Sequence, residues 1–300
     1  MLRSSPESPI GIRIASAGSC SCWHEVQPGV LAQEAEILYF VTSNPTVDVL
    51  TRDTGEDAAA SAMTTDRLLD GSTVLITGAA GNLGRALARA FAVRGAKLVL
   101  VDHRREALVA AFETETEQRM FAVVNLVEQQ EVDAMIATAL KRFKRIDVLC
   151  NIAGGFRMGA PVHQTADKDW DFLFDLNTRT LLHMARAVVP RMLEGGGGKI
   201  VNVGAFAAQK GVAQMGAYIA SKSAVIRLTE SMAAELREKN INVNCVLPTI
   251  IDTPENRAAM PNADPGRWVA PEDLANVIVF LASPEARAIH GAALPVTGLS

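Results

Sequence analysis

The sequence predicts an α/β protein, a single domain built on a doubly wound parallel sheet of about seven strands with helices on both faces. Short apolar runs alternate along the chain with longer amphipathic stretches, which is the pattern of repeated β-α units. The short runs are almost continuously apolar, as is typical of parallel strands that are covered on both faces. A glycine-rich segment at the first strand–helix junction is a third indication of this fold class.

The apolar runs give the strands, and the amphipathic stretches between them give the helices. A segment rich in Pro and Asn, 254–268, follows the sixth strand and is predicted to be a mobile lid over the substrate. The predicted strands are 73–77, 97–101, 120–124, 146–150, 199–203, 241–247 and 292–296. The predicted helices are 82–94, 128–143, 166–193, 216–239 and 271–283.

The composition excludes several classes of partner. The formal net charge is −4, so neither nucleic acid nor an anionic membrane surface is an expected partner. No apolar run is long enough to cross a bilayer and the N-terminus lacks the apolar core of a signal peptide, so a cytoplasmic location is expected. Cys150 and Cys245 close apolar runs and are predicted to be buried free thiols. Cys20 and Cys22 have only His24 nearby, and no metal site is predicted.

Residues 1–62 differ from the rest of the chain, because they are acidic, rich in Ser, Pro and Gly, and without a sustained period. They are interpreted as a disordered leader, a small accessory element, or sequence upstream of the natural start, with preference for the last. Met63 opens a stretch that looks like the beginning of a domain. The predicted division is therefore an extension, 1–62, without chemistry of its own, and a nucleotide-binding domain, 63–300.

Three glycines at intervals of three residues follow the first predicted strand. Gly78, Gly81 and Gly84 would form a tight turn that lets a pyrophosphate approach the backbone. The helix that follows offers unpaired N–H groups and the positive end of its dipole. This segment predicts a dinucleotide site.

An acidic residue at the end of the second strand bears on the choice of dinucleotide. Asp102 lies where a carboxylate accepts hydrogen bonds from the adenosine ribose, and it would repel a 2′-phosphate. Arg104 and Arg105 follow directly and could compensate such a phosphate. NAD is therefore favoured, and NADP is possible.

Several motifs in order make the chain resemble the short-chain dehydrogenase/reductase family over residues 69–300. They are the glycine segment, the stretch 151–154 after the fourth strand, Asn177, the Tyr218-x-x-x-Lys222 motif, and Pro248 followed by Thr253. The resemblance implies a Rossmann-like domain that binds NAD(P) and transfers hydride between the cofactor and a small-molecule carbonyl or alcohol. It also implies a homodimer or homotetramer.

The resemblance assigns roles to individual residues. Tyr218 would be the general acid/base, Lys222 would supply the nearby cation that a tyrosine needs to act near neutral pH, and Asn177 would help to hold a water for proton relay. On the substrate side lie Ala205 and Phe206. The implied cofactor-binding residues are Gly78, Gly81, Asn82, Leu83, Gly84, Asp102, Asn125, Leu126, Asn151, Ala153, Gly154, Tyr218, Lys222, Pro248, Ile251 and Thr253.

The chain departs from the usual family pattern in three places. Ala205 stands where a serine is expected, Asn82 stands where the middle glycine is expected, and Thr249 follows Pro248 in place of glycine. Loss of one donor to a developing oxyanion typically costs about 10²–10³ in turnover. The glycine spacing and the alanine are similar to those of the dihydropteridine reductase branch, whose quinonoid substrate does not need the serine.

Three hypotheses remain open. The leading one is an NAD(P)-dependent oxidoreductase whose substrate is unknown and could be a conjugated or quinonoid ring. The alternative is an NAD-binding sensor or scaffold that has lost turnover because Ala205 replaces the serine. The third, a structural component without cofactor, conflicts with the intact glycine segment.

Overall fold

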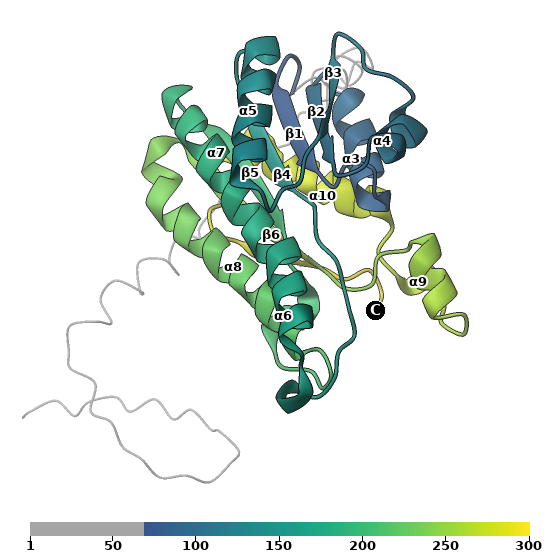
Figure 1. Ribbon diagram of the computed structural model, residues 1–300. Helices are drawn as coiled ribbons and strands as arrows, with labels where there is room; N and C mark the ends of the chain where they lie inside the picture. The colour runs from purple at the N-terminus through teal and green to yellow at the C-terminus, as the bar shows by residue number, and fades with distance from the viewer. Residues whose placement is uncertain (1–68) are drawn as a thin grey trace, which may run out of the picture. The chain divides into compact units, whose positions relative to one another are not determined.

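The computed structural model describes residues 69–300 (Figure 1). The predicted boundary at residue 62 and the pair Cys20 and Cys22 lie outside the described residues. Within them, the predicted fold class is confirmed: a seven-stranded sheet carries helices on both faces. Cys150 and Cys245 are buried free thiols, as predicted.

All neighbouring strands of the sheet run parallel, in the order β3-β2-β1-β4-β5-β6-β7. The chain builds outward from β1 to β3 and then returns to place β4 on the other side of β1. This reversal is a topological switch point, where open α/β sheets bind ligands outside the carboxyl ends of the strands. The strands are Thr73–Thr77 (β1), Lys97–Asp102 (β2), Arg119–Val123 (β3), Val148–Asn151 (β4), Gly198–Val203 (β5), Ile241–Pro248 (β6) and Ala293–Val296 (β7).

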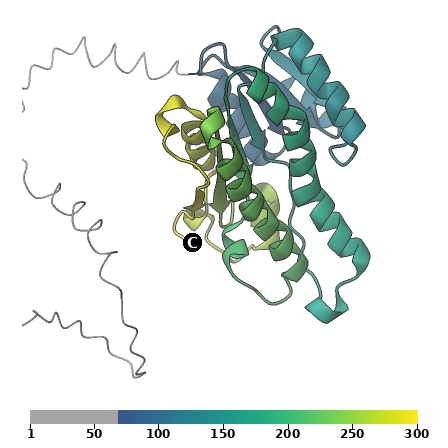
Figure 2. The same cartoon turned by 90° about the vertical axis from the view of Figure 1, so that its left-hand side faces the viewer.

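Two layers of helices sandwich the sheet (Figures 1 and 2). The core on one face gathers side chains of α3, α4 and α10, and the core on the other gathers those of α5, α7 and α8. Strand β1 contributes side chains to both cores, because successive side chains of a strand point to opposite faces of the sheet. Val74 and Ile76 lie in the first core and Leu75 in the second, and all three are fully buried. The helices are Asn82–Ala92 (α3), Arg105–Phe112 (α4), Gln129–Phe143 (α5), Asp167–Phe174 (α6), Thr180–Glu194 (α7), Gly216–Leu236 (α8), Pro254–Ala259 (α9) and Pro271–Ala282 (α10).

The structure differs from the sequence prediction mainly in two helical regions. The helix predicted over 166–193 is divided into α6 and α7 by a π-helical turn, Asp175–Arg179. Such turns are rare and often occur at functional sites. Helix α4 had not been predicted, and the predicted lid, 254–268, contains the short helix α9 and a 3₁₀ turn, Pro265–Arg267.

Candidate active site

The glycine segment folds into a tight loop between β1 and α3. Gly78 has φ +64°, a conformation that favours glycine, and a Cβ there would lie 3.0 Å from Ala153 Cα. A Cβ on Gly84 would lie 2.6 Å from Ala79 O, so this position also excludes a side chain. Gly81 is different: its φ is −70° and a Cβ would meet only Gly78 O, at 3.4 Å. The first and third glycines therefore shape the loop, whereas the second leaves open space beside it.

This open loop fits the phosphates of a dinucleotide. Helix α3 begins after Gly81 without a side-chain acceptor for its first N–H groups. An anionic ligand can take up these groups and is favoured by the helix dipole. The loop lies at the switch point, beside the segment that leaves β4. The residues present therefore suit the group that the sequence predicted.

The carboxylate of Asp102 at the end of β2 is oriented by backbone groups. Its Oδ1 accepts from His103 N at 2.9 Å and from Arg104 N at 3.4 Å, and the His103 ring lies 3.2 Å away. Its Oδ2 accepts from Ala80 N in the glycine segment at 3.2 Å. Oδ1 is thus fully engaged, while Oδ2 retains acceptor capacity for a ribose hydroxyl.

Thr77, at the end of β1, holds the segment that follows β4. Its Oγ1 accepts from Ile152 N at 3.0 Å and from Ala153 N at 3.1 Å. Asn151 lies beneath this segment, and its side chain donates to Asn202 Oδ1 on β5 at 2.8 Å. The side chain of Asn151 therefore ties neighbouring strands together, and its buried Oδ1 is left without a partner.

Helix α8 carries Tyr218 and Lys222 four residues apart, so both lie on one face of the helix. The Lys222 ammonium is buried and donates to Val203 O at the end of β5, at 2.8 Å. A Cβ on Gly154 would lie 2.9 Å from both Lys222 Nζ and Asn177 Oδ1. The absence of a side chain on Gly154 therefore lets the segment after β4 approach both polar groups.

Asn177 lies in the π-helical turn and joins this segment to α8. Its Oδ1 accepts from Gly155 N at 2.9 Å, and its Nδ2 donates to Gly155 O at 3.1 Å and to Ser221 Oγ at 3.0 Å. Ser221 Oγ in turn donates to Tyr218 O at 2.8 Å. Both hydrogens of the Asn177 amide are thus used to fix protein groups. The water-holding role that the resemblance implies stays a prediction.

Ala205, which stands where a serine is expected, lies in an apolar environment. Ala205 is 4% exposed and belongs to an apolar cluster with Leu181, Val225 and Leu247, against which Tyr218 packs. The following residue, Phe206, is 38% exposed and begins a 3₁₀ turn. The tyrosine ring is therefore held by apolar contacts on this side.

Comparison with known proteins decides the family. The model of the short chain dehydrogenases matches residues 72–264. The chain belongs to the short-chain dehydrogenase family. It is 35% identical over 245 residues to D-threitol dehydrogenase of Mycolicibacterium smegmatis, covering 78% of this chain and 94% of that protein.

Other members of the family are similar over the same part of the chain. A 3-oxoacyl-(acyl-carrier-protein) reductase of Thermotoga maritima is 33% identical over 241 residues, covering 77% of this chain and 98% of the reductase. The crystal structure of NAD⁺-bound xylitol dehydrogenase superposes with a TM-score of 0.71 at 28% identity, covering 77% of this chain and 99% of that one. The resemblance to the dihydropteridine reductase branch stays a prediction.

Burial shifts the proton affinities of the two motif residues of this dehydrogenase in opposite directions. It raises the pKa of Tyr218 to about 12 and lowers the pKa of Lys222 to about 8. The Lys222 ammonium donates to Val203 O, and desolvation is the cause of the raised pKa of Tyr218. Activation of Tyr218 by Lys222 stays a prediction.

Three sequence-predicted cofactor residues have side chains engaged in the protein itself. Leu83 and Leu126 are buried in the two cores, because they lie on the inward side of α3 and before α5. Asn125 is exposed, and its Oδ1 accepts from Val127 N at 3.3 Å. The predicted bond from Asn125 to adenine and the contacts of the two leucines with the cofactor stay predictions.

The last group of predicted residues lies between β6 and α9. Pro248 ends β6 and is buried, while Ile251 forms an isolated bridge with Val269. Thr253 caps α9, its Oγ1 accepting from Asn256 N at 3.2 Å. These contacts fix the start of α9.

Sequence reasoning missed three residues that organise the site: Thr77, Ser221 and Phe156. Thr77 directly precedes the glycine segment and Ser221 lies inside the Tyr-x-x-x-Lys motif. Their positions next to these motifs could have indicated that both belong to the site. Phe156 contacts the Tyr218 ring across a long sequence separation, which no local pattern indicates.

Among residues 69–300, no helix is both long and apolar enough to cross a membrane.

Proposed function

We propose that this chain is an NAD-preferring oxidoreductase in which Tyr218 exchanges a proton with the reacting oxygen of the substrate. One observation carries the proposal. At the carboxyl ends of β1, β4 and β5, the glycine segment lies close to the half-buried Tyr218 and the buried Lys222. A chain that only bound a nucleotide would need the glycine segment and Asp102, but would have little reason to keep Tyr218, Lys222 and Asn177 together.

The residues of the chain divide the chemistry among them. The nicotinamide ring, when bound, supplies or accepts the hydride. Tyr218 holds a proton on Oη at neutral pH, and burial raises its pKa further, so it can protonate the oxygen that becomes a hydroxyl. In the opposite direction, the phenolate takes that proton back. Lys222, partly protonated near pH 8, brings positive charge to the same helix face and stabilises the phenolate.

Asn177 and Phe156 orient the acid/base without exchanging its proton. Asn177 fixes Ser221, and Ser221 fixes the backbone of Tyr218. Phe156 contacts the phenol ring edge-on. The direction of the Tyr218 hydroxyl is thereby set before a substrate arrives, which reduces the entropic cost of reaching the reactive geometry.

Asp102 supports the preference for NAD. Its Oδ2 is available to a ribose hydroxyl, and its charge disfavours a 2′-phosphate at the same place. Arg104 and Arg105 are exposed and could balance such a phosphate. We expect NADH to bind more tightly than NADPH by about tenfold or more.

The cavity beside Tyr218 is lined by both polar and apolar side chains. Arg157, Thr165 and Gln214 line it, together with the apolar Met158 and Met215. The similarity to a threitol dehydrogenase and a xylitol dehydrogenase favours polyols. The missing serine favours instead a conjugated or quinonoid ring, because hydride addition to such a ring does not create a ketone oxyanion.

The experiment measures binding and turnover separately. Protein fluorescence follows titration with NADH and NADPH, and absorbance of the reduced nicotinamide follows reactions with polyols, ketones, quinones and a quinonoid dihydropterin. Turnover that disappears in Tyr218→Phe supports the proposal. Unchanged turnover in that variant overturns the assigned mechanism.

The alternative is a binding protein that has lost turnover, and the apolar surroundings of Ala205 favour it. It predicts tight NADH binding without reaction on any compound of the panel. Ala205→Ser tests it further, with Ala208→Ser as the control, because Ala208 is a buried alanine of the same cluster. Ketone reduction gained only in Ala205→Ser would show that the remaining carbonyl site is formed.

A further inference from the structure

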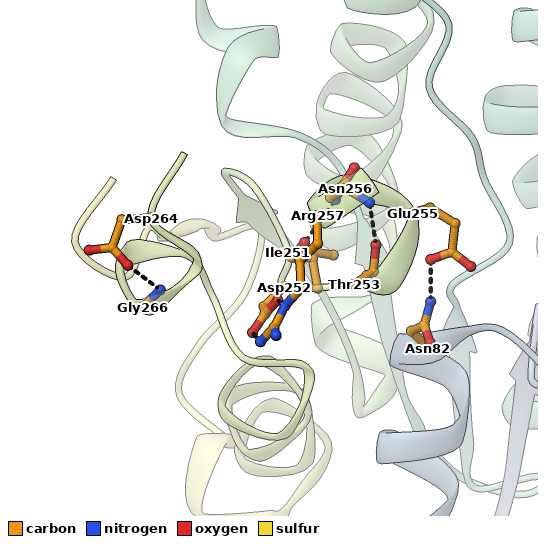
Figure 3. Close-up of polar contacts among 9 residues, drawn as sticks. All are labelled: Asn82, Ile251, Asp252, Thr253, Glu255, Asn256, Arg257, Asp264 and Gly266. Carbon is orange, nitrogen blue, oxygen red and sulfur yellow. Dashed lines mark hydrogen bonds and ion pairs between the residues drawn. The ribbon is translucent and has the colours of Figure 1, made fainter. Parts of the chain in front are cut away.

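The segment that was predicted to be a lid is fixed at its base by a set of short polar contacts (Figure 3). Asp252 and Arg257 form a bidentate ion pair with N–O distances of 2.6 and 2.7 Å. Asn256 Nδ2 donates to Ile251 O at 2.8 Å, and Thr253 caps the helix. Helix α9 therefore has a defined orientation relative to the end of β6.

One contact joins this helix to the glycine segment. Asn82 Nδ2 donates to Glu255 Oε2 at 2.9 Å, across 173 residues of sequence (Figure 3). Asn82 is the first residue of α3, so the carboxylate is only one side chain away from the uncapped N-terminus where the phosphates fit. Arg85, one turn along α3, donates to Asn82 Oδ1 at 2.6 Å.

The contact brings charge to the phosphate site. The pKa of Glu255 is lowered, first by the hydrogen bond to its own backbone N–H and then by the Thr253 hydroxyl, with smaller contributions from Asn82 and Arg85. Glu255 is therefore ionised at neutral pH. It is also exposed, so it can turn away from Asn82 when another anion arrives.

We infer that Glu255 limits how tightly this dehydrogenase holds its dinucleotide, because its carboxylate competes with the pyrophosphate for Asn82 and for the positive charge of Arg85. The inference rests on the proposed function. The contact between Asn82 and Glu255 would then determine how tightly the cofactor binds and how fast it is released. The contact exists because an asparagine stands where the family usually has a glycine. Removal of the negative charge leaves Asn82 and Arg85 available to the phosphates.

Glu255→Gln tests the charge while keeping a hydrogen-bond acceptor for Asn82. We expect the dissociation constant of NADH to fall by about threefold to tenfold and the dissociation rate to fall in parallel. Both are measured by fluorescence, by titration and by stopped-flow displacement, and neither needs a substrate. The difference from wild type should shrink as the salt concentration rises from about 50 mM to about 1 M.

Glu272→Gln is the matched control. Glu272 on α10 also makes an exposed contact with α3, to Arg89 Nη2 at 3.0 Å. Arg89 lies seven residues beyond Asn82, about 10 Å along the helix. The control also removes one negative charge that contacts α3, but at a position away from the loop. NADH affinity should therefore be unchanged.

A double variant tests whether Glu255 acts through Asn82. In an Asn82→Ala background, Glu255→Gln should change the dissociation constant by less than it does in wild type. Equal or weaker NADH binding in Glu255→Gln, or an equal gain in Glu272→Gln, overturns the inference and leaves the proposed function standing. Failure of wild type to bind either dinucleotide overturns both.

Discussion

The ring of Phe156 stands perpendicular to the ring of Tyr218, with centroids 5.0 Å apart and an interplanar angle of 89°. This edge-on arrangement is favoured between aromatic rings. Phe156 follows two glycines of the segment after β4, one of which Asn177 binds through its backbone. The hydrogen bonds of Asn177 and the ring of Phe156 thus fix the same stretch of chain against α8.

Phe156→Ala should lower kcat/KM by about threefold to tenfold, because an aromatic pair contributes about 0.5–1.5 kcal/mol beyond its burial. The free energy of unfolding should change by less than about 1 kcal/mol, since Phe156 is 58% exposed. Steady-state kinetics and urea denaturation measure the two effects. Phe280→Ala, at a 43% exposed phenylalanine on α10, is the control and should leave kcat/KM unchanged.

Tyr218→Phe should lower kcat by about 10²–10⁴ while NADH affinity stays within about twofold, because only the proton donor is removed. The wild-type pH profile should also depend on direction. Burial raises the pKa of Tyr218 to about 12, so the protonated form needed for reduction persists across about pH 6–9. Oxidation needs the phenolate and should accelerate as the pH rises over that range. An oxidation rate that falls with pH would contradict the assignment.

Lys222→Met should be more stable relative to wild type at low pH than at high pH. Burial lowers the folded-state pKa of Lys222 from 10.5 to about 8, so the folded protein binds this proton less readily than the unfolded chain. Wild type loses stability because its folded state holds a buried charge, and it regains this stability as the pH rises from about 8 to about 10.5. The variant has no such change. The unfolding free energy of the variant minus that of wild type should therefore fall by about 1–3 kcal/mol over that window.

Urea denaturation at about pH 7 and about pH 10.5 checks this shift. The lost hydrogen bond to Val203 O lowers the stability of the variant at both pH values, so the change with pH is the informative quantity. A difference that is independent of pH would mean that Lys222 is not desolvated in the folded protein.

Features governed by local pattern could be predicted from the sequence. The strand ends differ from the prediction by at most two residues, since continuous apolar runs define the strands. The four-residue spacing of Tyr218 and Lys222 is sufficient to place both on one face of α8. The acid at the end of β2 meets the glycine segment because parallel strands end at the same edge of the sheet.

Features that depend on contacts between distant segments could not be predicted. The π-helical turn has no distinct local signal, since 166–193 has the residues of a continuous helix, yet it orients Asn177 toward Gly155 and Ser221. The contact between Asn82 and Glu255 depends on how β1 and β6 are ordered in the sheet. The orientation of the Lys222 ammonium toward Val203 O likewise follows only from the packing of α8 on β5 and β6.

Gly84 shapes the loop of the glycine segment, whereas Gly81 leaves space for the phosphates. Two substitutions can separate these roles. A Cβ on Gly84 would lie 2.6 Å from Ala79 O and 2.7 Å from Ala79 Cα, and backbone atoms cannot move away cheaply. Gly84→Ala should therefore lower the free energy of unfolding by about 2–4 kcal/mol. A Cβ on Gly81 would meet only Gly78 O at 3.4 Å, and its φ of −70° suits alanine.

Gly81→Ala should accordingly change the unfolding free energy by less than about 1 kcal/mol, the loss of a favourable N-cap residue being offset by a less flexible unfolded chain. Its methyl group would nevertheless occupy the open side of the loop, and NADH should bind at least about tenfold more weakly. Urea denaturation and fluorescence titration of both variants give the two quantities. If Gly81→Ala kept wild-type NADH affinity, the phosphates would not bind on this side of the loop, because a Cβ at position 81 could not then lie in their path.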